Sequence, residues 1–225
     1  MLSRKRLTVI FLSLFLLPGC AAAKSKEENE FQNLRVDQVR SLVKRLTSPQ
    51  FVPIAGETLY PFSFSFHKVN NNSNIREGKG FILVQGSLWC LVRKWLDKET
   101  LALGMRVFIV DRDKKEFVAE FRQWPKGNKR AKWNNWLCIR LDQSESSASD
   151  AYYLEWYFPE GTEQRIIPAD KWSLYGQFTW LANGLLEKMT SFTNSYVRYY
   201  YNGLKITRIE FGKEGLTHTM TSFKY

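Results

Sequence analysis

The order of apolar and polar residues changes its period once along the chain, and the change separates one helical segment from a β-rich remainder. Between residues 31 and 46 the apolar positions recur every three or four residues, as in an amphipathic helix. Ser48-Pro49 ends this pattern, because a residue that precedes proline is disfavoured in a helix. We expect the helix to pack its apolar face on a sheet, with a helix lying on the membrane surface as the alternative. On a helical wheel that face consists of Phe31, Val39, Leu42, Val43 and Leu46.

After this helix, apolar and polar residues alternate, as in strands that have one buried face. The clearest alternation runs from Phe62 to His67. Asn202-Gly203 separates two apolar runs and is the strongest short hairpin signal that a sequence offers. Residues 81–92 predict one long strand with a bulge or bend at Gly86-Ser87, and residues 183–192 predict a short helix. In all, the pattern indicates about nine or ten short strands.

The predicted architecture is α+β with a large share of strands. Runs of strands without alternating helices favour an antiparallel sheet. We therefore expect the N-terminal amphipathic helix to pack on a large antiparallel sheet, which forms a sandwich or a curved, partly closed barrel. No repeat of fixed period and no linker divides residues 31–225, and their number suits one globular domain with its own core.

The N-terminus carries the pattern of an exported protein. Arg4, Lys5 and Arg6 precede the apolar run of residues 7–17, in which only Thr8 and Ser13 are polar. A short cationic segment before such a run is typical of a secretory signal peptide. The run is shorter than the roughly 20 apolar residues that a transmembrane helix needs. We expect residues 1–19 to be a signal peptide that is removed.

The run ends in Leu17-Pro18-Gly19-Cys20. This segment resembles the lipobox of bacterial lipoprotein precursors, in which a leucine three places upstream and a small residue before the cysteine mark the cleavage point. The resemblance implies a diacylglyceryl thioether on Cys20, cleavage before that residue, and acylation of the new amine. Two or three acyl chains, at about 0.8 kcal/mol per buried methylene, anchor a protein firmly in a membrane.

The residues after Cys20 bear on its location. Ala21 stands where, in such lipoproteins, an aspartate would favour retention in the inner membrane. The resemblance therefore implies the outer membrane if the host has two membranes, and the outer face of the plasma membrane if it has one. Residues 20–30 contain no large apolar side chain, so we expect a hydrated tether, within which Ser25 and Glu28 predict a capping box and the start of the helix.

The charge at first suggests a nucleic-acid binder, because the chain has a formal net charge of +11 and 8 Trp, 10 Tyr and 16 Phe. Removal of the three signal-peptide cations lowers the charge to +8, and export removes contact with nucleic acid. Four cations lie in one seven-residue segment bracketed by tryptophans. At an envelope surface this mixture suits anionic headgroups, phosphorylated lipopolysaccharide or acidic glycans, and a solvated hairpin loop is the alternative. The candidate binding residues are Trp124, Lys126, Lys129, Arg130, Lys132 and Trp133.

The sequence carries no strong catalytic or metal-binding signature. His67 and His218 are its two histidines, each on a predicted strand. No Gly-x-Ser-x-Gly elbow is present and no glycine-rich phosphate loop, since Glu77-Gly78-Lys79-Gly80 is too weak a match. Cysteines and histidines lack metal-ligand spacing. We therefore name no catalytic residue, metal or cofactor, although a carboxylate pair for glycoside hydrolysis leaves no signature and stays open.

Cys90 and Cys138 remain once Cys20 is lipidated. Outside the cytoplasm an even pair favours a disulfide, which would close a loop of about 48 residues and contribute about 4 kcal/mol. Two buried free thiols are the alternative. The predicted function is that of a membrane-anchored envelope lipoprotein, a non-catalytic binding or assembly component that contacts an envelope protein, an anionic amphiphile or a glycan. A hydrolase that acts on an envelope polymer is the alternative.

Overall fold

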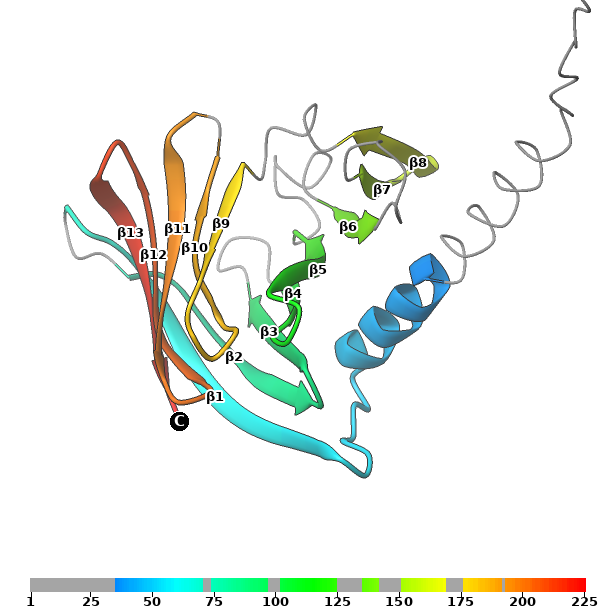
Figure 1. Ribbon diagram of the computed structural model, residues 1–225, viewed down its shortest axis with the longest axis horizontal. Coiled ribbons are helices and arrows are strands. Elements are labelled where there is room, and N and C mark those ends of the chain that lie inside the picture. Colours follow the sequence, from blue (N-terminus) through cyan, green and yellow to red (C-terminus); the bar gives the residue numbers. More distant parts are fainter. Residues whose placement is uncertain are drawn as a thin grey trace, which may run out of the picture.

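The computed structural model describes residues 35–70, 74–96, 102–124, 135–141, 151–168, 176–191 and 193–225. In these residues the chain forms a helix at 35–47 and a single antiparallel sheet of 13 strands (Figure 1). The predicted β-rich, antiparallel architecture is confirmed. The strands are β1 (Glu57–Lys68), β2 (Asn74–Gln85), β3 (Leu88–Leu96), β4 (Leu103–Asp111), β5 (Glu116–Gln123), β6 (Trp136–Leu141), β7 (Ala151–Phe158), β8 (Gly161–Pro168), β9 (Gln177–Trp180), β10 (Leu186–Thr190), β11 (Ser195–Asn202), β12 (Lys205–Lys213) and β13 (Leu216–Lys224).

The sheet consists of two meanders that meet at the pair β1–β13. Strands β1 to β8 follow one another in sequence order across one half, and β9 to β13 do so across the other. The first strand of one meander pairs antiparallel with the last strand of the other, with Phe64 opposite Phe223. Strands β8 and β9 are the two ends of the sheet, and no pairing joins them in the described residues, so the sheet is not closed there.

The two meanders face each other across an inner core. The ring of Phe108 on β4 stacks on that of Tyr199 on β11, with centroids 5.8 Å apart. The indole Nε1 of Trp89 on β3 donates a 3.0 Å hydrogen bond to the Leu204 carbonyl, next to β12. Because these contacts join strands that are far apart in the sheet order, the curved sheet folds over and its inner face is buried (Figure 1).

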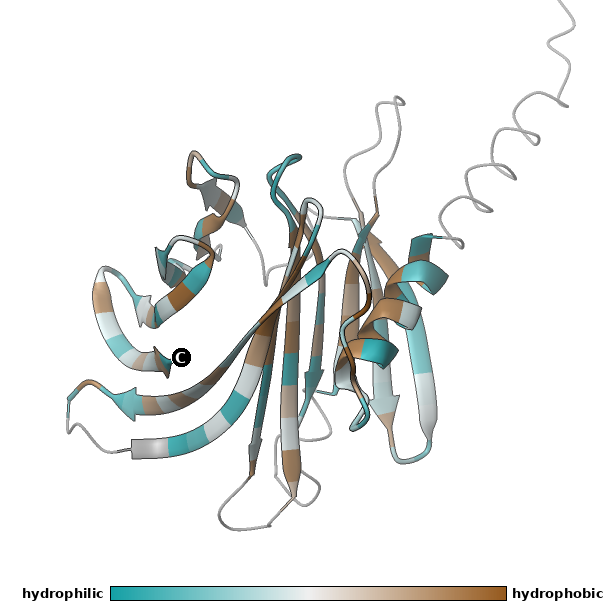
Figure 2. Ribbon diagram, turned by 90° about the horizontal axis from the view of Figure 1, so that it is seen from below, coloured by the Kyte–Doolittle hydropathy of each residue, from teal (hydrophilic) through white to brown (hydrophobic). Residues whose placement is uncertain are grey.

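The other face of the first meander, its outer face, contacts the helix at 35–47. Four helical side chains are buried in one cluster with side chains of β3, β4 and β6, among them Cys90, Ile109 and Ile139. Figure 2 shows hydrophobic residues in the middle of the long strands and on the helix beside them. These strands are therefore apolar on both faces, which explains runs without alternation such as Trp89–Val92. The buried helical residues are Val36, Val39, Val43 and Leu46.

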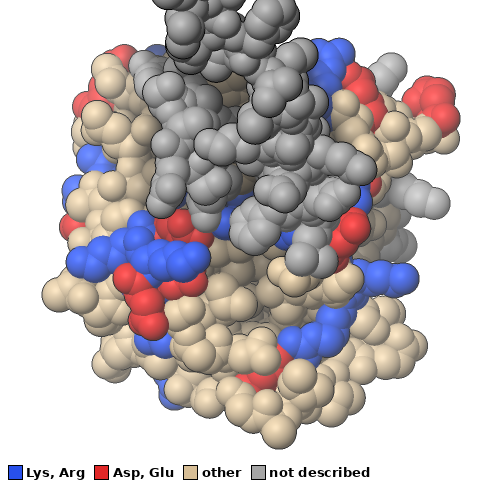
Figure 3. Space-filling model, turned by 45° about the vertical axis from the view of Figure 1, so that its right-hand side comes forward, with Lys and Arg blue, Asp and Glu red and all other residues tan. Residues whose placement is uncertain are grey.

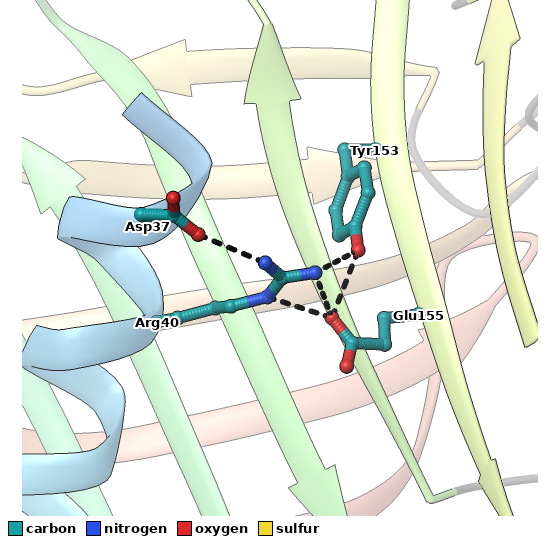
Figure 4. Close-up of polar contacts among 4 residues, drawn as sticks. All are labelled: Asp37, Arg40, Tyr153 and Glu155. Atoms are coloured by element: carbon teal, nitrogen blue, oxygen red, sulfur yellow. Dashed lines mark hydrogen bonds and ion pairs between the residues drawn. The ribbon is translucent and has the colours of Figure 1, made fainter. Parts of the chain in front are cut away.

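Ion pairs join the same helix to the sheet. Arg40 Nε donates a 2.9 Å hydrogen bond to a carboxylate oxygen of Glu155 on β7, and the Tyr153 hydroxyl donates to the same oxygen at 2.9 Å (Figure 4). Burial, together with the hydrogen bond and the charge of Glu155, raises the pKa of Tyr153 to about 12. On its solvent side Arg40 also contacts Asp37, whose side chain is 69% exposed, against 10% for Glu155.

We expect Glu155→Gln to lower the free energy of unfolding by about 1–3 kcal/mol, because it removes the charge from two hydrogen bonds at a buried position. Asp37→Asn is the matched control, since it removes the exposed carboxylate partner of the same arginine and is expected to change stability by less than about 1 kcal/mol. Urea denaturation of the three proteins measures both effects. Equal losses in the two variants would contradict the assignment of Glu155 as the stronger partner.

The structure corrects two local predictions. Residues 81–92 do not form one bulged strand, because Gly86-Ser87 is a tight turn between β2 and β3 in which Gly86 has φ +55°. Residues 183–192, predicted to be a helix, contain strand β10. Its sequence Leu-Glu-Lys-Met-Thr favours a helix locally, but β9 and β11 pair with it on both sides and fix it as a strand.

The expected disulfide is also corrected, because Cys90 and Cys138 are both free and buried. Cys90 lies in the cluster under the helix, whereas Cys138 lies in the inner core, so the two thiols point to opposite faces of the sheet. Three strand spacings separate β3 from β6, or about 14 Å, and a disulfide needs Cα atoms within about 7 Å. Burial raises the pKa of the Cys90 thiol to about 12.

Candidate ligand-binding site

A cavity of about 690 Å³ lies between the two meanders. Its volume falls in the range of about 300–1,000 Å³ that is usual for small-molecule sites. One wall comes from β1 to β5 and the other from β10 to β13 and the turn between β10 and β11. Half of the described lining residues are apolar or aromatic, including Phe64, Phe66, Trp95, Trp124, Met189 and Ile209. Hydroxyl groups on the second wall come from Ser191, Thr193, Ser195, Tyr196, Thr219 and Thr221.

Three arginines of the lining lie directly opposite one another on adjacent strands. Arg93 on β3 is paired with Arg106 on β4, which is paired with Arg122 on β5. We call these three residues the arginine row. Side chains at paired positions point to the same face of a sheet, and like charges placed there destabilise it. Such a row on the inner face therefore needs counter-charges, from the protein or from a bound group.

A fourth arginine lies among the aromatic rings of the same cavity. The guanidinium carbon of Arg76 on β2 is 5.0 Å from the ring centroids of both Trp95 and Trp124. Those two indoles meet edge to face, with centroids 6.1 Å apart. Cation–π contacts of this kind stabilise a guanidinium against an aromatic wall. The cationic end of the cavity is thereby joined to its aromatic wall.

One carboxylate neutralises part of the row. The side chain of Glu120 on β5 is fully buried, accepts a hydrogen bond from Arg122 Nη2 at 2.8 Å, and forms an ion pair with Arg106. The three arginines of the row against one glutamate leave a formal charge of +2 on these four described side chains. In a low-dielectric cavity this surplus is a strong attraction for an anion.

Arg93 is the member of the row that lacks a carboxylate within ion-pair distance among the described residues, and its side chain makes no hydrogen bond to them. Burial, and after it the charge of Arg106, lowers the pKa of Arg93 to about 9, although Tyr199 and Glu120 act in the opposite direction. The guanidinium therefore stays protonated at neutral pH but has lost much of its hydration. An anionic ligand would supply the missing counter-charge.

Two glycines of β2 allow aromatic rings of the neighbouring strand β1 to lie across it. Gly80 pairs with Arg93 on one side and with Phe62 on the other, and Gly78 pairs with Trp95 and Phe64 in the same way. A Cβ at Gly80 would lie 2.8 Å from the ring of Phe62, and one at Gly78 would lie 2.6 Å from the ring of Phe64. Because glycine has no side chain, both rings can lie across the strand. The segment Glu77-Gly78-Lys79-Gly80, which matches a phosphate loop only weakly, is thus part of the strand beside the arginine row.

The predicted binding segment is described only at its first residue. Trp124 lines the cavity, and its backbone N–H donates a 2.6 Å hydrogen bond to the side chain of Asn135. The other five predicted binding residues and the predicted lipidation site lie outside the described residues. They are Lys126, Lys129, Arg130, Lys132, Trp133 and Cys20.

The histidines do not belong to this cavity. His67 Nε2 is 2.9 Å from the Ser65 hydroxyl on the same strand, but neither residue lines the cavity, and His218 is exposed. Figure 3 shows a different face, on the helix side, where Lys and Arg lie next to Asp and Glu over the described surface. On the described part of that face, charges of the two signs are mixed.

Neither the other side-chain clusters of the described residues nor the comparisons with known proteins add a second candidate site. In the described part of the chain, no three His, Cys, Asp or Glu side chains are grouped so that they could hold a metal ion. The described helix lacks the length and apolar character needed to cross a membrane. No protein-family model matches the chain, and no curated protein matches its sequence.

Proposed function

We propose that the protein is a bacterial envelope lipoprotein, anchored through acylated Cys20, whose β domain binds an anionic amphiphile in the inner cavity. The observation that carries the proposal is the arginine row in a cavity with aromatic walls. The lipobox-like segment before Cys20 supports the anchor. In a host with two membranes we propose the outer membrane as its location, because of Ala21.

The lining has an apolar part and a cationic part, and together they favour a ligand with an apolar tail and an anionic group. Aromatic and aliphatic side chains favour burial of an apolar tail, at about 25 cal/mol per Å² of surface removed from water. The arginine row favours an anionic group at one end of that tail. A purely apolar ligand would leave Arg93 without a counter-charge, and a purely ionic ligand would leave the aromatic wall exposed to water.

Binding rather than hydrolysis is favoured by the chemistry of the lining. The carboxylate of Glu120 is engaged in ion pairs with two arginines of the row. The histidines lie elsewhere, as described above. We also propose that the sheet acts as a partly closed container and that the helix at 35–47 covers its outer face while the ligand occupies the inner one.

The test compares three small probes on the full-length lipidated protein in phosphatidylcholine vesicles. Octanoate has both a tail and a negative charge, octanol lacks the charge, and acetate lacks the tail. Titration is followed by tryptophan fluorescence, because Trp95 and Trp124 line the cavity. Charge-assisted hydrogen bonds are worth about 1.5–3 kcal/mol, so octanoate is expected to bind about 10- to 100-fold more tightly than octanol. Acetate is expected to bind weakly. Equal binding of octanoate and octanol would refute the proposal.

The anchor makes a separate prediction. Cys20→Ser is expected to abolish acylation and to prevent cleavage at this position, because the thioether needs the cysteine sulfur. Metabolic labelling with a radioactive fatty acid and the mass of the mature chain measure both effects. Ser3→Ala, which changes a residue of the signal peptide outside the lipobox-like segment, is the control and is expected to remain labelled. Fatty-acid incorporation into the Cys20→Ser protein at the level of the control would contradict the anchor.

A further inference from the structure

The positive charge of the arginine row exceeds what one carboxylate ligand can neutralise. The row carries a formal charge of +2 when Glu120 is counted. A carboxylate would leave about +1, whereas a phosphomonoester, which carries about −1.5 to −2 near pH 7, would leave the row close to neutral. The residual repulsion within the arginine row is therefore smallest with the doubly charged group.

The spacing of the arginines also suits a group with several acceptor oxygens. Cβ atoms at directly paired cross-strand positions lie about 4.5–5.5 Å apart, so the guanidinium groups of Arg93 and Arg106 can reach one ligand group together. A carboxylate has two oxygens in one plane and matches the geometry of a single guanidinium fork best. The three terminal oxygens of a phosphate can accept from two forks at different angles.

The facing wall offers neutral hydrogen-bond donors as well. Thr219 and Thr221 on β13 line the cavity, and neither side chain makes a hydrogen bond to another described residue. Thr221 is only 3% exposed. Hydroxyls of this kind donate to phosphate oxygens that the arginines leave unfilled.

From these observations we propose that the anionic group taken by the cavity is a phosphomonoester dianion attached to an apolar tail. The ligand class is thus an alkyl or acyl phosphate, or a lipid with a terminal phosphate, rather than a fatty acid. This inference rests on the proposed amphiphile-binding function and narrows it to one headgroup. Arg93 is the principal contact, because it has no carboxylate partner in the described structure.

The experiment uses the full-length lipidated protein in phosphatidylcholine vesicles at pH 7.5, where Arg93 is protonated. Four probes are titrated by tryptophan fluorescence: octyl phosphate, methyl octyl phosphate, octanoate and inorganic phosphate. Methyl octyl phosphate keeps the tetrahedral shape but carries a single charge. Octyl phosphate is expected to bind at least about 10-fold more tightly than each of the other three.

Each outcome separates the two proposals. If octanoate binds as tightly as octyl phosphate, the headgroup inference is overturned while the amphiphile function stands. If neither binds, the amphiphile function itself fails. If inorganic phosphate binds as tightly as octyl phosphate, the site takes free phosphate and the tail plays no part. These comparisons use the unaltered protein, so none depends on whether a variant folds.

A variant locates the preference at Arg93. Arg93→Lys keeps the positive charge but loses the planar fork, so the preference for octyl phosphate over octanoate is expected to fall below about 3-fold. Lys79→Gln on β2 is the control, because Lys79 is exposed and lies outside the cavity. An unchanged preference in the Arg93→Lys protein would show that another group selects the phosphate.

Discussion

Glu120→Gln is expected to lower the free energy of unfolding by about 3–5 kcal/mol, the usual cost of removing one partner from a buried ion pair. The side chain of Glu120 is fully buried and contacts both Arg106 and Arg122. Without its charge, Arg106 and Arg122 would lose the carboxylate that they share. Urea denaturation of the full-length protein, without added ligand, measures the loss.

Two further measurements identify charge imbalance as the cause. Glu120→Gln combined with Arg122→Gln removes one positive and one negative charge, so the double variant is expected to recover most of the loss. Octyl phosphate is expected to raise the unfolding temperature of Glu120→Gln more than that of the unaltered protein, because an anion replaces the lost carboxylate. If the double variant is no more stable than the single one, packing around Glu120 is responsible.

The strands and hairpins that could be predicted are those with local signals. Asn202-Gly203 marks a hairpin because a tight turn there needs positive φ, and Gly203 has φ +58°. Gly86-Ser87 carries a similar signal, but apolar residues on both sides also fit one bulged strand. The two alternatives differ only in whether β2 and β3 pair, which depends on contacts between residues rather than on either segment alone.

The arginine row could not be predicted because it depends on register. In the chain, Arg93, Arg106 and Arg122 are 13 and 16 positions apart, and none stands in a recognisable motif. A partial signal does exist on β3, where Arg93 lies between Leu91 and Trp95 in the alternation of inner-face positions. An arginine at a core-facing position is unusual unless it has a partner. The partners become visible only when β3, β4 and β5 are aligned.

The disulfide prediction was wrong for the same reason, because it also depends on the register between strands. Both cysteines stand next to a tryptophan in an apolar strand, which made them look equivalent. In the sheet, Ile139 is the neighbour of Cys138 that shares a face with Cys90, through Ile109 and Ala119 on the strands between. A disulfide depends on this parity, which the sequence around each cysteine does not contain.

Arg93→Gln is expected to abolish phosphate binding and at the same time to stabilise the unliganded protein. The affinity for octyl phosphate is expected to fall by about 100-fold, because two charge-assisted hydrogen bonds are lost. Removal of a half-buried charge that has no carboxylate partner among the described residues is expected to raise the free energy of unfolding by about 0.5–2 kcal/mol. Opposite changes in stability and affinity are typical of a residue retained for binding. Lys79→Gln, which also removes one positive charge, is the control and is expected to change neither quantity appreciably.

The lowered pKa of Arg93 predicts how the stability difference between Arg93→Gln and the unaltered protein changes with pH. The pKa of Arg93 in the folded protein is about 9, below its ordinary value of 12.5, so the folded state releases the proton more readily than the unfolded state. The cost of the charge is therefore fully present below about pH 9 and diminishes as the pH rises from there toward 12.5. The stability advantage of Arg93→Gln over the unaltered protein should be larger at pH 7.5 than at pH 10. Other groups titrate in both proteins alike and cancel in the difference. An advantage that grows with pH, or a variant that is less stable yet still binds octyl phosphate, would show that Arg93 serves the fold rather than the ligand.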